Sequence, residues 1–255
     1  SEHDPGLYRP QPLSGNDEGR RNFFSGAAQP SDRDGGVNIM KNYLVLVNAE
    51  HPLLHPVDPS ELVCAFDEYP GILLERTASK ALRKLLADIG NKNEIVPVSG
   101  WRSREEQKKI WEDTVAERGI DFARKYVALP ACSEHETGLA IDLALNAPDI
   151  DFICPEFPRT GICRRFRELA PYYGFIERYQ KAKEPITGIS EEPWHFRYVG
   201  TPHSVVIAEN GLSLEEYIER RTENTQANSR QYLFCGNAGN DGNINSTRRG
   251  ERKAR

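Results

Sequence analysis

The 255-residue chain lacks several features that mark particular classes of protein. It has no run of 18 or more apolar residues, so no transmembrane helix is expected. It opens with SEHDPGLYRP, which lacks the charged start and apolar stretch of a secretory signal. The formal net charge is -5 and the charges are interspersed, which provides no basic face for a phosphate backbone. A membrane-spanning or nucleic-acid-binding protein is therefore disfavoured.

Paired cysteine motifs are also missing. The chain has five cysteines, and none of them belongs to a Cys-x-x-Cys pair. An odd number of scattered cysteines is more typical of a reducing compartment than of a disulfide framework. We therefore expect a cytoplasmic protein, with the cell envelope as the alternative if a leader or an anchor has been removed.

Hydrophobic periodicity is confined to the middle of the chain. Residues 1–39 are rich in Gly, Pro, Asp, Asn and Ser and are predicted to be a disordered leader or linker. The single methionine, Met40, marks the expected start of the folded unit. Residues 222–255 again lack a period and end in a basic cluster, which predicts a disordered tail. Residues 40–221 are long enough for one catalytic domain.

Helical and strand patterns alternate within residues 40–221. Leucines and isoleucines at helical spacing predict a helix over 79–90, which ends at Gly90. A Ser-x-x-Glu capping box predicts that a second helix begins at Ser103 and runs to Gly119. Strands are predicted in EIVPVSGWR, GLAIDLAL and WHFRYVG, and further helices in IDFARKYVA, CRRFRELAPYYGF and SLEEYIERR.

The segment CSEHETGLAID raises the possibility of a metal site. Asp142 follows His135 by seven positions and shares its strand face only with alanines, and a carboxylate buried there needs a strong partner. A divalent metal is one such partner, and a simple His–Asp hydrogen bond is the alternative. His195 lies on a strand whose other face supplies aromatic residues to the core. Two nitrogens and one oxygen, with the fourth position left to water, are typical of catalytic zinc.

Two further side chains suit hydrolysis at such a site. Glu192 precedes His195 by three residues, and a carboxylate near the reacting water can accept its proton. The alternative is an ordinary solvated glutamate, like its neighbour Glu191. Arg102 at a strand end could stabilise developing negative charge, with a surface ion pair as the alternative.

Three motifs resemble those of a known peptidase family. SEHETGLAID fits S-x-H-x-x-G-x-A-x-D, EPWH fits E-x-W-H, and SGWRS fits G-[YW]-R-S. These segments resemble the VanY and VanXY D-alanyl-D-alanine peptidases, and YGFIERY and ITGISEEPWHFRYVGTPHS look most like the VanXY branch. The resemblance covers residues 40–220. It implies an α+β fold in which helices flank a small central antiparallel sheet that carries a zinc peptidase site.

The resemblance also implies roles for individual residues. His135, Asp142 and His195 would bind one zinc ion per chain. Glu192 would act as general base and acid, and Arg102 would polarise the scissile carbonyl and stabilise the oxyanion.

Three more residues are expected to contact the peptide. By the same resemblance, Ser133 and Gln107 would hold its carboxylate end. The alternatives are that Ser133 is a simple turn residue and that Gln107 occupies an exposed helix position. If Ser99 lines the position before the scissile bond, the ammonium group of a free dipeptide lacks an anionic partner there. Longer peptides would then be favoured, unless Glu134, Glu136 or the acids of PDIDF supply the missing charge.

The expected function is zinc-dependent hydrolysis of peptidoglycan precursors that end in D-Ala-D-Ala. The enzyme would release the C-terminal D-Ala or split the free dipeptide, in support of glycopeptide (vancomycin) resistance or cell-wall remodelling. An L,D-carboxypeptidase is an alternative that shares all three motifs. A non-catalytic cell-wall-binding protein is a second alternative, against which the complete set of metal ligands and base argues.

Overall fold

The computed structural model describes residues 42–236, so the predicted leader and residues 237–255 lie outside it. Contacts divide the chain into one unit that ends at Glu215 and a second that begins at Glu216. Within the described residues, no helix combines the length and apolar character that a membrane span requires.

The strands form two antiparallel sheets. A hairpin of β1 and β2 makes the smaller sheet, and the larger has the order β3-β4-β6-β5. Every neighbouring pair in the larger sheet is antiparallel, which confirms the predicted α+β class with an antiparallel sheet flanked by helices. The strands are β1 (Leu62–Phe66), β2 (Tyr69–Glu75), β3 (Ile95–Ser99), β4 (Ala140–Leu145), β5 (Phe175–Tyr179) and β6 (Glu192–Tyr198).

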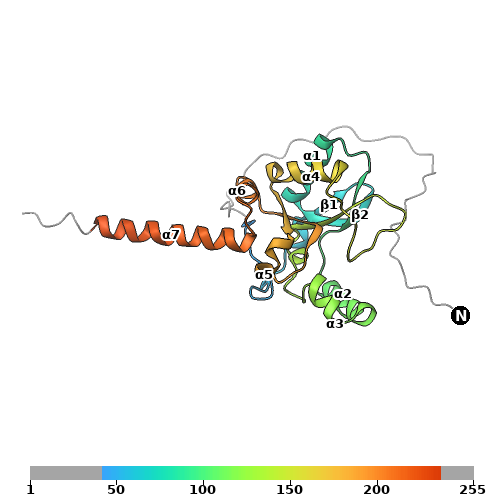
Figure 1. Cartoon of the computed structure of the whole chain (residues 1–255), viewed down its shortest axis with the longest axis horizontal. Helices are drawn as coiled ribbons and strands as arrows, with labels where there is room; N and C mark the ends of the chain where they lie inside the picture. Colours follow the sequence, from blue (N-terminus) through green and yellow to red (C-terminus); the bar gives the residue numbers. More distant parts are fainter. Residues whose placement is uncertain (1–41, 237–255) are drawn as a thin grey trace, which may run out of the picture. The chain divides into compact units, whose positions relative to one another are not determined.

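The helices include those predicted from the sequence. α1 and α4 lie next to each other, and α2 and α3 form a separate pair (Figure 1). The capping box at the start of α2 is present: the Ser103 hydroxyl accepts from the backbone of Glu106, and the Glu106 carboxylate accepts from that of Ser103. The α-helices are α1 (Arg76–Ile89), α2 (Arg104–Arg118), α3 (Ile120–Tyr126), α4 (Gly161–Leu169), α5 (Glu184–Thr187), α6 (His203–Glu209) and α7 (Leu214–Gly236), and short 3-10 helices span Pro59–Glu61, Glu134–Thr137, Ala170–Tyr173 and Lys181–Lys183.

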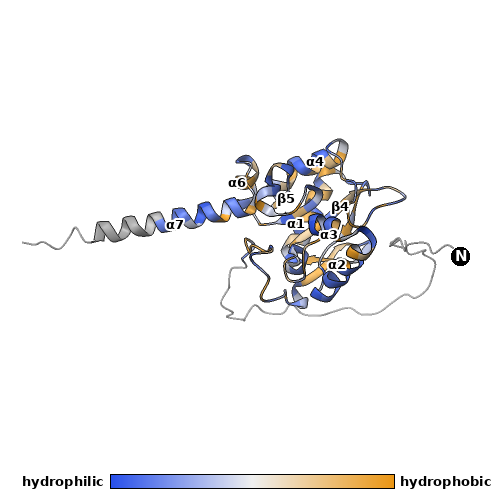
Figure 2. Cartoon of the chain, turned by 60° about the horizontal axis from the view of Figure 1, so that its bottom comes forward, coloured by the Kyte–Doolittle hydropathy of each residue, from blue (hydrophilic) through white to orange (hydrophobic). Residues whose placement is uncertain are grey.

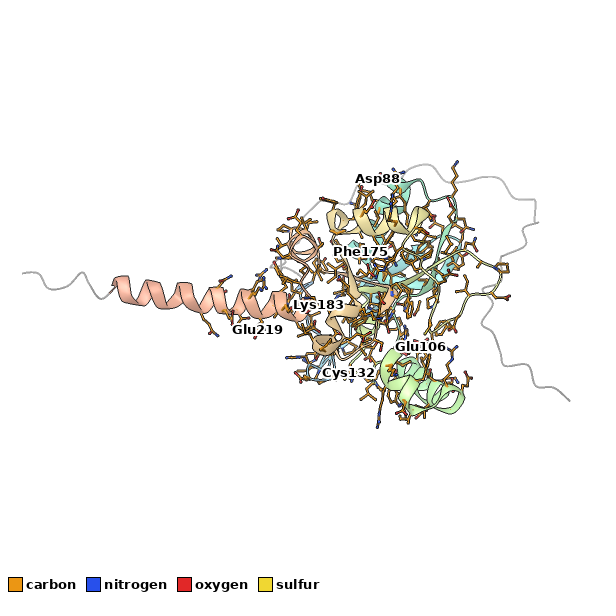
Figure 3. The ribbon with its side chains drawn as sticks, in the orientation of Figure 1. Asp88, Glu106, Cys132, Phe175, Lys183 and Glu219 are labelled. Carbon is orange, nitrogen blue, oxygen red and sulfur yellow. The ribbon has the colours of Figure 1, made fainter. Side chains whose placement is uncertain are left out.

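One face of the larger sheet supplies the main hydrophobic core. The alternation in GLAIDLAL places Leu139, Ile141 and Leu143 on this face, where they pack with the buried leucines of α1. The aromatic residues of β6 and Phe166 of α4 complete the core, which confirms the predicted orientation of both strands. Figure 3 shows Phe175 surrounded by packed side chains, whereas Asp88 of α1 lies at the surface.

The opposite face of the sheet carries the polar residues. The strand register pairs Asp142 on β4 directly with His195 on β6, and Ser99 on β3 with Asp142. Cross-strand partners lie on the same face of a sheet with neighbouring side chains. Residues that are far apart in the sequence therefore form one row across three strands.

Two glycines allow the backbone approaches that this arrangement needs. Gly138 has a φ of 70°, and a Cβ there would lie 2.8 Å from the Leu62 side chain. A Cβ at Gly100 would lie 2.4 Å from the Leu73 carbonyl oxygen. Larger residues at these positions would push apart the turn before β4 or the segment after β3, so the glycines of both motifs have a steric cause.

The C-terminal helix extends further than expected. The sequence predicts a disordered tail over residues 222–255, but α7 continues through residues 222–236. The sequence between Leu212 and Gly236 contains no glycine or proline, so nothing interrupts the backbone hydrogen bonds there. The described side chains of α7 are mainly hydrophilic (Figure 2), which explains why a hydrophobic period did not reveal the helix.

Candidate metal centre and active site

Three side chains that can bind a metal converge on the polar face of the sheet. His135 comes from the 3-10 helix Glu134–Thr137, Asp142 from β4 and His195 from β6. All three are buried, and one potential ligand atom from each lies within 4.8 Å of the others. Asp142 Oδ1 is 3.0 Å from His195 Nδ1, and Asp142 Oδ2 is 3.1 Å from His135 Nε2. The predicted trio is therefore assembled in space, and a metal ion could be bound there.

Hydrogen-bond partners determine which ring nitrogen each histidine offers. His135 Nδ1 lies 2.7 Å from the Gly100 carbonyl oxygen, and His195 Nε2 lies 3.3 Å from Glu134 Oε2. Carbonyl and carboxylate oxygens only accept, so these nitrogens donate, and His135 Nε2 and His195 Nδ1 face the Asp142 carboxylate. The nitrogens and the carboxylate need a cation between them, either a proton or a metal ion, so the donor set fits a metal ion.

The electrostatics of the trio agree with this interpretation. Burial and the Arg102 charge lower the pKa of His135 to about 4, which keeps its imidazole neutral, the form that binds metals. Burial opposes a charge on His195, yet hydrogen bonds to Asp142 and Glu134 raise its pKa to about 9. The surrounding carboxylates therefore favour a positive charge on the His195 imidazole, and a metal ion bound at Nδ1 would take the place of a proton.

Arg102 is held rigidly beside the trio. Its Nη2 donates to Asp142 Oδ2 at 3.1 Å, its Nε donates to Ser99 Oγ at 2.8 Å, and its Nη1 donates to Gln107 Oε1 at 3.1 Å. The surface ion pair considered as an alternative is wrong, because the partner of Arg102 is the buried Asp142 and its own side chain is only 14% exposed. A guanidinium group fixed on three sides is suited to stabilise charge in a reaction.

Glu192 is buried at the start of β6, so the solvated surface glutamate is also excluded. Its Oε2 lies 3.8 Å from His195 Nδ1. Burial raises the pKa of Glu192 to about 8, the nearby Asp142 adds to the increase, and His195 and Arg102 oppose it. A carboxyl group with a pKa near neutrality can both accept and deliver a proton.

The three residues predicted to contact the peptide lie in different environments. Ser133 is buried and lines the pocket, and its hydroxyl does not cap the following 3-10 helix. Gln107 is only 1% exposed, so the exposed helix position is wrong, but its amide already donates to the Ala128 carbonyl and accepts from Arg102. Ser99 faces an adjoining cavity and holds Arg102. Gln107 and Ser99 thus contact the arginine in this structure.

A single pocket contains most of these groups. Its cavity volume is about 40 Å³, which is room for an ion and a few water molecules. Residues of α2 and α3 form part of its wall, so this helix pair bounds the site. All the predicted site residues except Ser99 line it: Arg102, Gln107, Ser133, His135, Asp142, Glu192 and His195.

Two pocket residues were missed as site residues. Glu134 was considered only as a charge for the substrate, but it accepts hydrogen bonds from Arg178 and Arg197. Tyr179, opposite Glu192 in the register, packs its ring 4.9 Å from that of His195. In the sequence, only the position of Glu134 beside His135 indicates that Glu134 belongs to the site. Nothing in the motifs indicates that Tyr179 does. Glu136 does not supply a substrate charge, because it pairs with Arg104.

Comparison with known proteins places the site residues within a peptidase family. Residues 71–201 match the family model described as VanY, D-alanyl-D-alanine carboxypeptidase. The chain belongs to this VanY family. It is 43% identical over 177 residues to the bifunctional D-Ala-D-Ala dipeptidase and carboxypeptidase VanXYC of Enterococcus gallinarum, a match that covers 69% of this chain and 93% of the relative. Membership confirms the resemblance to VanY and VanXY peptidases.

Three solved structures of peptidases share the fold. The D,D-dipeptidase VanXYg, in complex with a D-Ala-D-Ala phosphinate analogue, has 54% identity and a TM-score of 0.68, and the match covers 70% of each chain. The LD-carboxypeptidase LdcB has 36% identity and a TM-score of 0.60 over 70% of this chain and 86% of its own. A VanY D,D-pentapeptidase mutant with Zn(II) has 32% identity and a TM-score of 0.57 over 70% of this chain and 99% of its own.

Proposed function

We propose that the protein is a zinc-dependent peptidase that removes the C-terminal D-Ala from peptidoglycan precursors ending in D-Ala-D-Ala, and that it also splits the free dipeptide. The observation that carries this proposal is the assembly of His135, Asp142 and His195 beside Glu192 and Arg102 in one buried pocket. Membership of the VanY family supports it, as does the similarity to VanXYC, which bears both activities in its name.

The metal would be held by His135 Nε2, a carboxylate oxygen of Asp142 and His195 Nδ1. Two nitrogens and one oxygen suit zinc, and the related VanY structure contains Zn(II). When bound, zinc supplies Lewis acidity that lowers the pKa of water and polarises a carbonyl group. One ion per chain is expected, since the described residues contain one such cluster.

Glu192 would move the proton during hydrolysis. As a carboxylate it accepts a proton from the attacking water, whose oxygen forms a bond to the scissile carbonyl carbon. It then delivers this proton to the amine nitrogen as the C–N bond breaks, so that D-Ala leaves as a neutral amine. A pKa near neutrality allows the same group to perform both transfers.

Arg102 and Ser133 would act on the substrate oxygens. Arg102 is charged and fixed at the pocket wall, where it can stabilise the negative charge that develops on the carbonyl oxygen. The Ser133 hydroxyl lines the same pocket and could donate to the C-terminal carboxylate of the peptide. Gln107 and Ser99 would contribute by holding Arg102.

Two wider consequences follow from this proposal. Removal of D-Ala-D-Ala termini would support glycopeptide (vancomycin) resistance or cell-wall remodelling. We also propose the cytoplasm as the location, because Cys64, Cys132, Cys154 and Cys163 are free thiols in the described part of the chain. The cell envelope remains the alternative.

Defined peptides test the proposed reaction. The purified protein should release free D-Ala from a pentapeptide that ends in D-Ala-D-Ala and should split the dipeptide with a lower kcat/KM, because the acids that line the described pocket already have other roles: Glu134 pairs with the arginines, Asp142 belongs to the metal site and Glu192 is assigned to proton transfer. Chiral chromatography identifies the products. The similarity to LdcB favours a second candidate, which cleaves a tetrapeptide at its L,D bond. Cleavage of the tetrapeptide alone would replace the D,D proposal with the L,D one.

Metal analysis tests the cofactor. Elemental analysis should give about one zinc per chain, a chelator should abolish hydrolysis and added zinc should restore it, because three protein ligands hold the ion. His51→Ala is the control: this exposed histidine bonds to Asn48, far in sequence from the trio, and its loss should leave the zinc content unchanged. Full activity in protein without stoichiometric metal would contradict the proposal.

A further inference from the structure

A cluster of buried charges lies next to the metal trio. It consists of Glu134, Arg178, Arg197 and Glu215, which we call the buried charge cluster. The side chains of Glu134, Arg178 and Arg197 are fully buried, and that of Glu215 is 14% exposed. Buried charges are costly unless they are paired, so each member needs its partners. The two negative charges of the glutamates balance the two positive charges of the arginines.

The two oxygens of Glu134 face different partners. Oε1 accepts from both arginines, from Arg178 Nε and from Arg197 Nη1, each at 2.8 Å. Oε2 lies 3.3 Å from His195 Nε2. A glutamate that served only the arginines could offer each guanidinium group its own oxygen. Here both guanidinium groups share one oxygen, and the other is directed at the imidazole.

The remaining contacts of the arginines fix Glu134 in place. Arg178 uses its other two nitrogens to bind both carboxylate oxygens of Glu215, at 2.6 and 3.0 Å. Arg197 donates to the backbone carbonyls of Tyr43, Val45 and Tyr198. Each guanidinium group is therefore anchored on its far side to main chain or to another acid. The direction in which Glu134 Oε2 points is set by this framework.

We propose that Glu134 is a positioning residue of the metal site: it accepts the Nε2 proton of His195 and so directs the Nδ1 lone pair toward the metal. The inference rests on the proposed zinc site. A carboxylate at this position only accepts, so it selects one tautomer and one ring orientation. Loss of such an outer partner typically lowers metal affinity by about 10- to 100-fold.

Glu134→Gln tests this role because the cluster dictates how the new amide must lie. Both arginines are donors and require the amide oxygen, which leaves the NH₂ group facing His195. An NH₂ donor requires a lone pair at Nε2, which moves the ring proton to Nδ1 and blocks the ligand atom. We expect the zinc dissociation constant of the folded full chain to rise by about 10- to 100-fold. Competition with a chromophoric chelator measures it, and the visible spectrum of the Co(II) form should change with the altered ligand.

Glu136→Gln is the matched control. Glu136 belongs to the same 3-10 helix, is equally buried and also pairs with an arginine, but its oxygens contact Arg104 and the Ala131 backbone. Both variants should lower the thermal unfolding temperature. Only Glu134→Gln should change the zinc dissociation constant and the Co(II) spectrum, which a merely structural role would leave unchanged.

A second variant covers the case in which Glu134→Gln does not fold. Glu134→Asp keeps the negative charge for the arginines but shortens the side chain by one carbon, which withdraws it from His195. Weaker zinc binding in a folded Glu134→Asp protein supports the inference. An unchanged zinc dissociation constant in whichever of the two variants folds overturns it. If the parent chain binds no zinc, the proposed function itself fails and this inference falls with it.

Discussion

Replacement of Glu192 by glutamine is expected to leave zinc bound and to reduce kcat by a factor of about 10² to 10⁴. Glutamine has the same shape, so the buried position should be retained, but it neither accepts a proton from water nor delivers one to the leaving amine. Glu192 Oε2 lies 3.8 Å from His195 Nδ1, so its carboxyl group lies beside the residues that would hold the metal. Steady-state kinetics together with elemental analysis measure both quantities.

Two comparison variants separate the roles in this experiment. Glu191→Gln alters the preceding residue, a partly exposed acid that pairs with Arg159, and should keep the parent kcat. His195→Ala removes a ligand and should lose both zinc and activity. If Glu192→Gln remained near full activity while His195→Ala lost its zinc, the metal site would stand and the assignment of the base would be wrong.

The sequence predicted the parts of the site that depend on local order. The period of two in GLAIDLAL placed Asp142 opposite the core, and the same alternation placed His195 opposite the aromatic residues of β6. The family motifs then indicated that Asp142 and His195 lie on the same face of one sheet. The strand register shows this directly, because Asp142 and His195 are cross-strand partners. Register depends on pairing between distant strands, which periodicity alone does not determine.

The roles that escaped the sequence depend on long-range contacts. Glu134 owes its environment to Arg178 and Arg197, which lie on strands more than 40 residues away in the sequence. Gln107 has an exposed pattern around it on α2, yet its side chain turns inward because Arg102 and the Ala128 carbonyl provide partners. A helical period reports the average face of a helix and cannot reveal one buried polar side chain.

The hydrogen bonds that fix Arg102 lead to a second large expected effect on catalysis. Arg102→Lys should keep zinc bound and lower kcat by a factor of about 10² to 10³, the effect of losing one preorganised donor at an oxyanion. A lysine retains the charge but has no fork of donors, so it cannot bind Ser99, Gln107 and Asp142 together as the guanidinium group does. The ammonium group would then be poorly placed relative to the carbonyl oxygen.

The division of the loss between kcat and KM distinguishes two roles for this arginine. A group that stabilises charge only in the transition state lowers kcat and leaves KM nearly unchanged, whereas one that binds the substrate carboxylate equally in both states raises KM alone. Arg104→Lys is the matched control, because this neighbouring arginine pairs with Glu136 and the Leu53 carbonyl, neither of which lines the pocket. It should retain the parent kcat. A rise in KM without loss of kcat in Arg102→Lys would reassign Arg102 from oxyanion stabilisation to recognition of the peptide terminus.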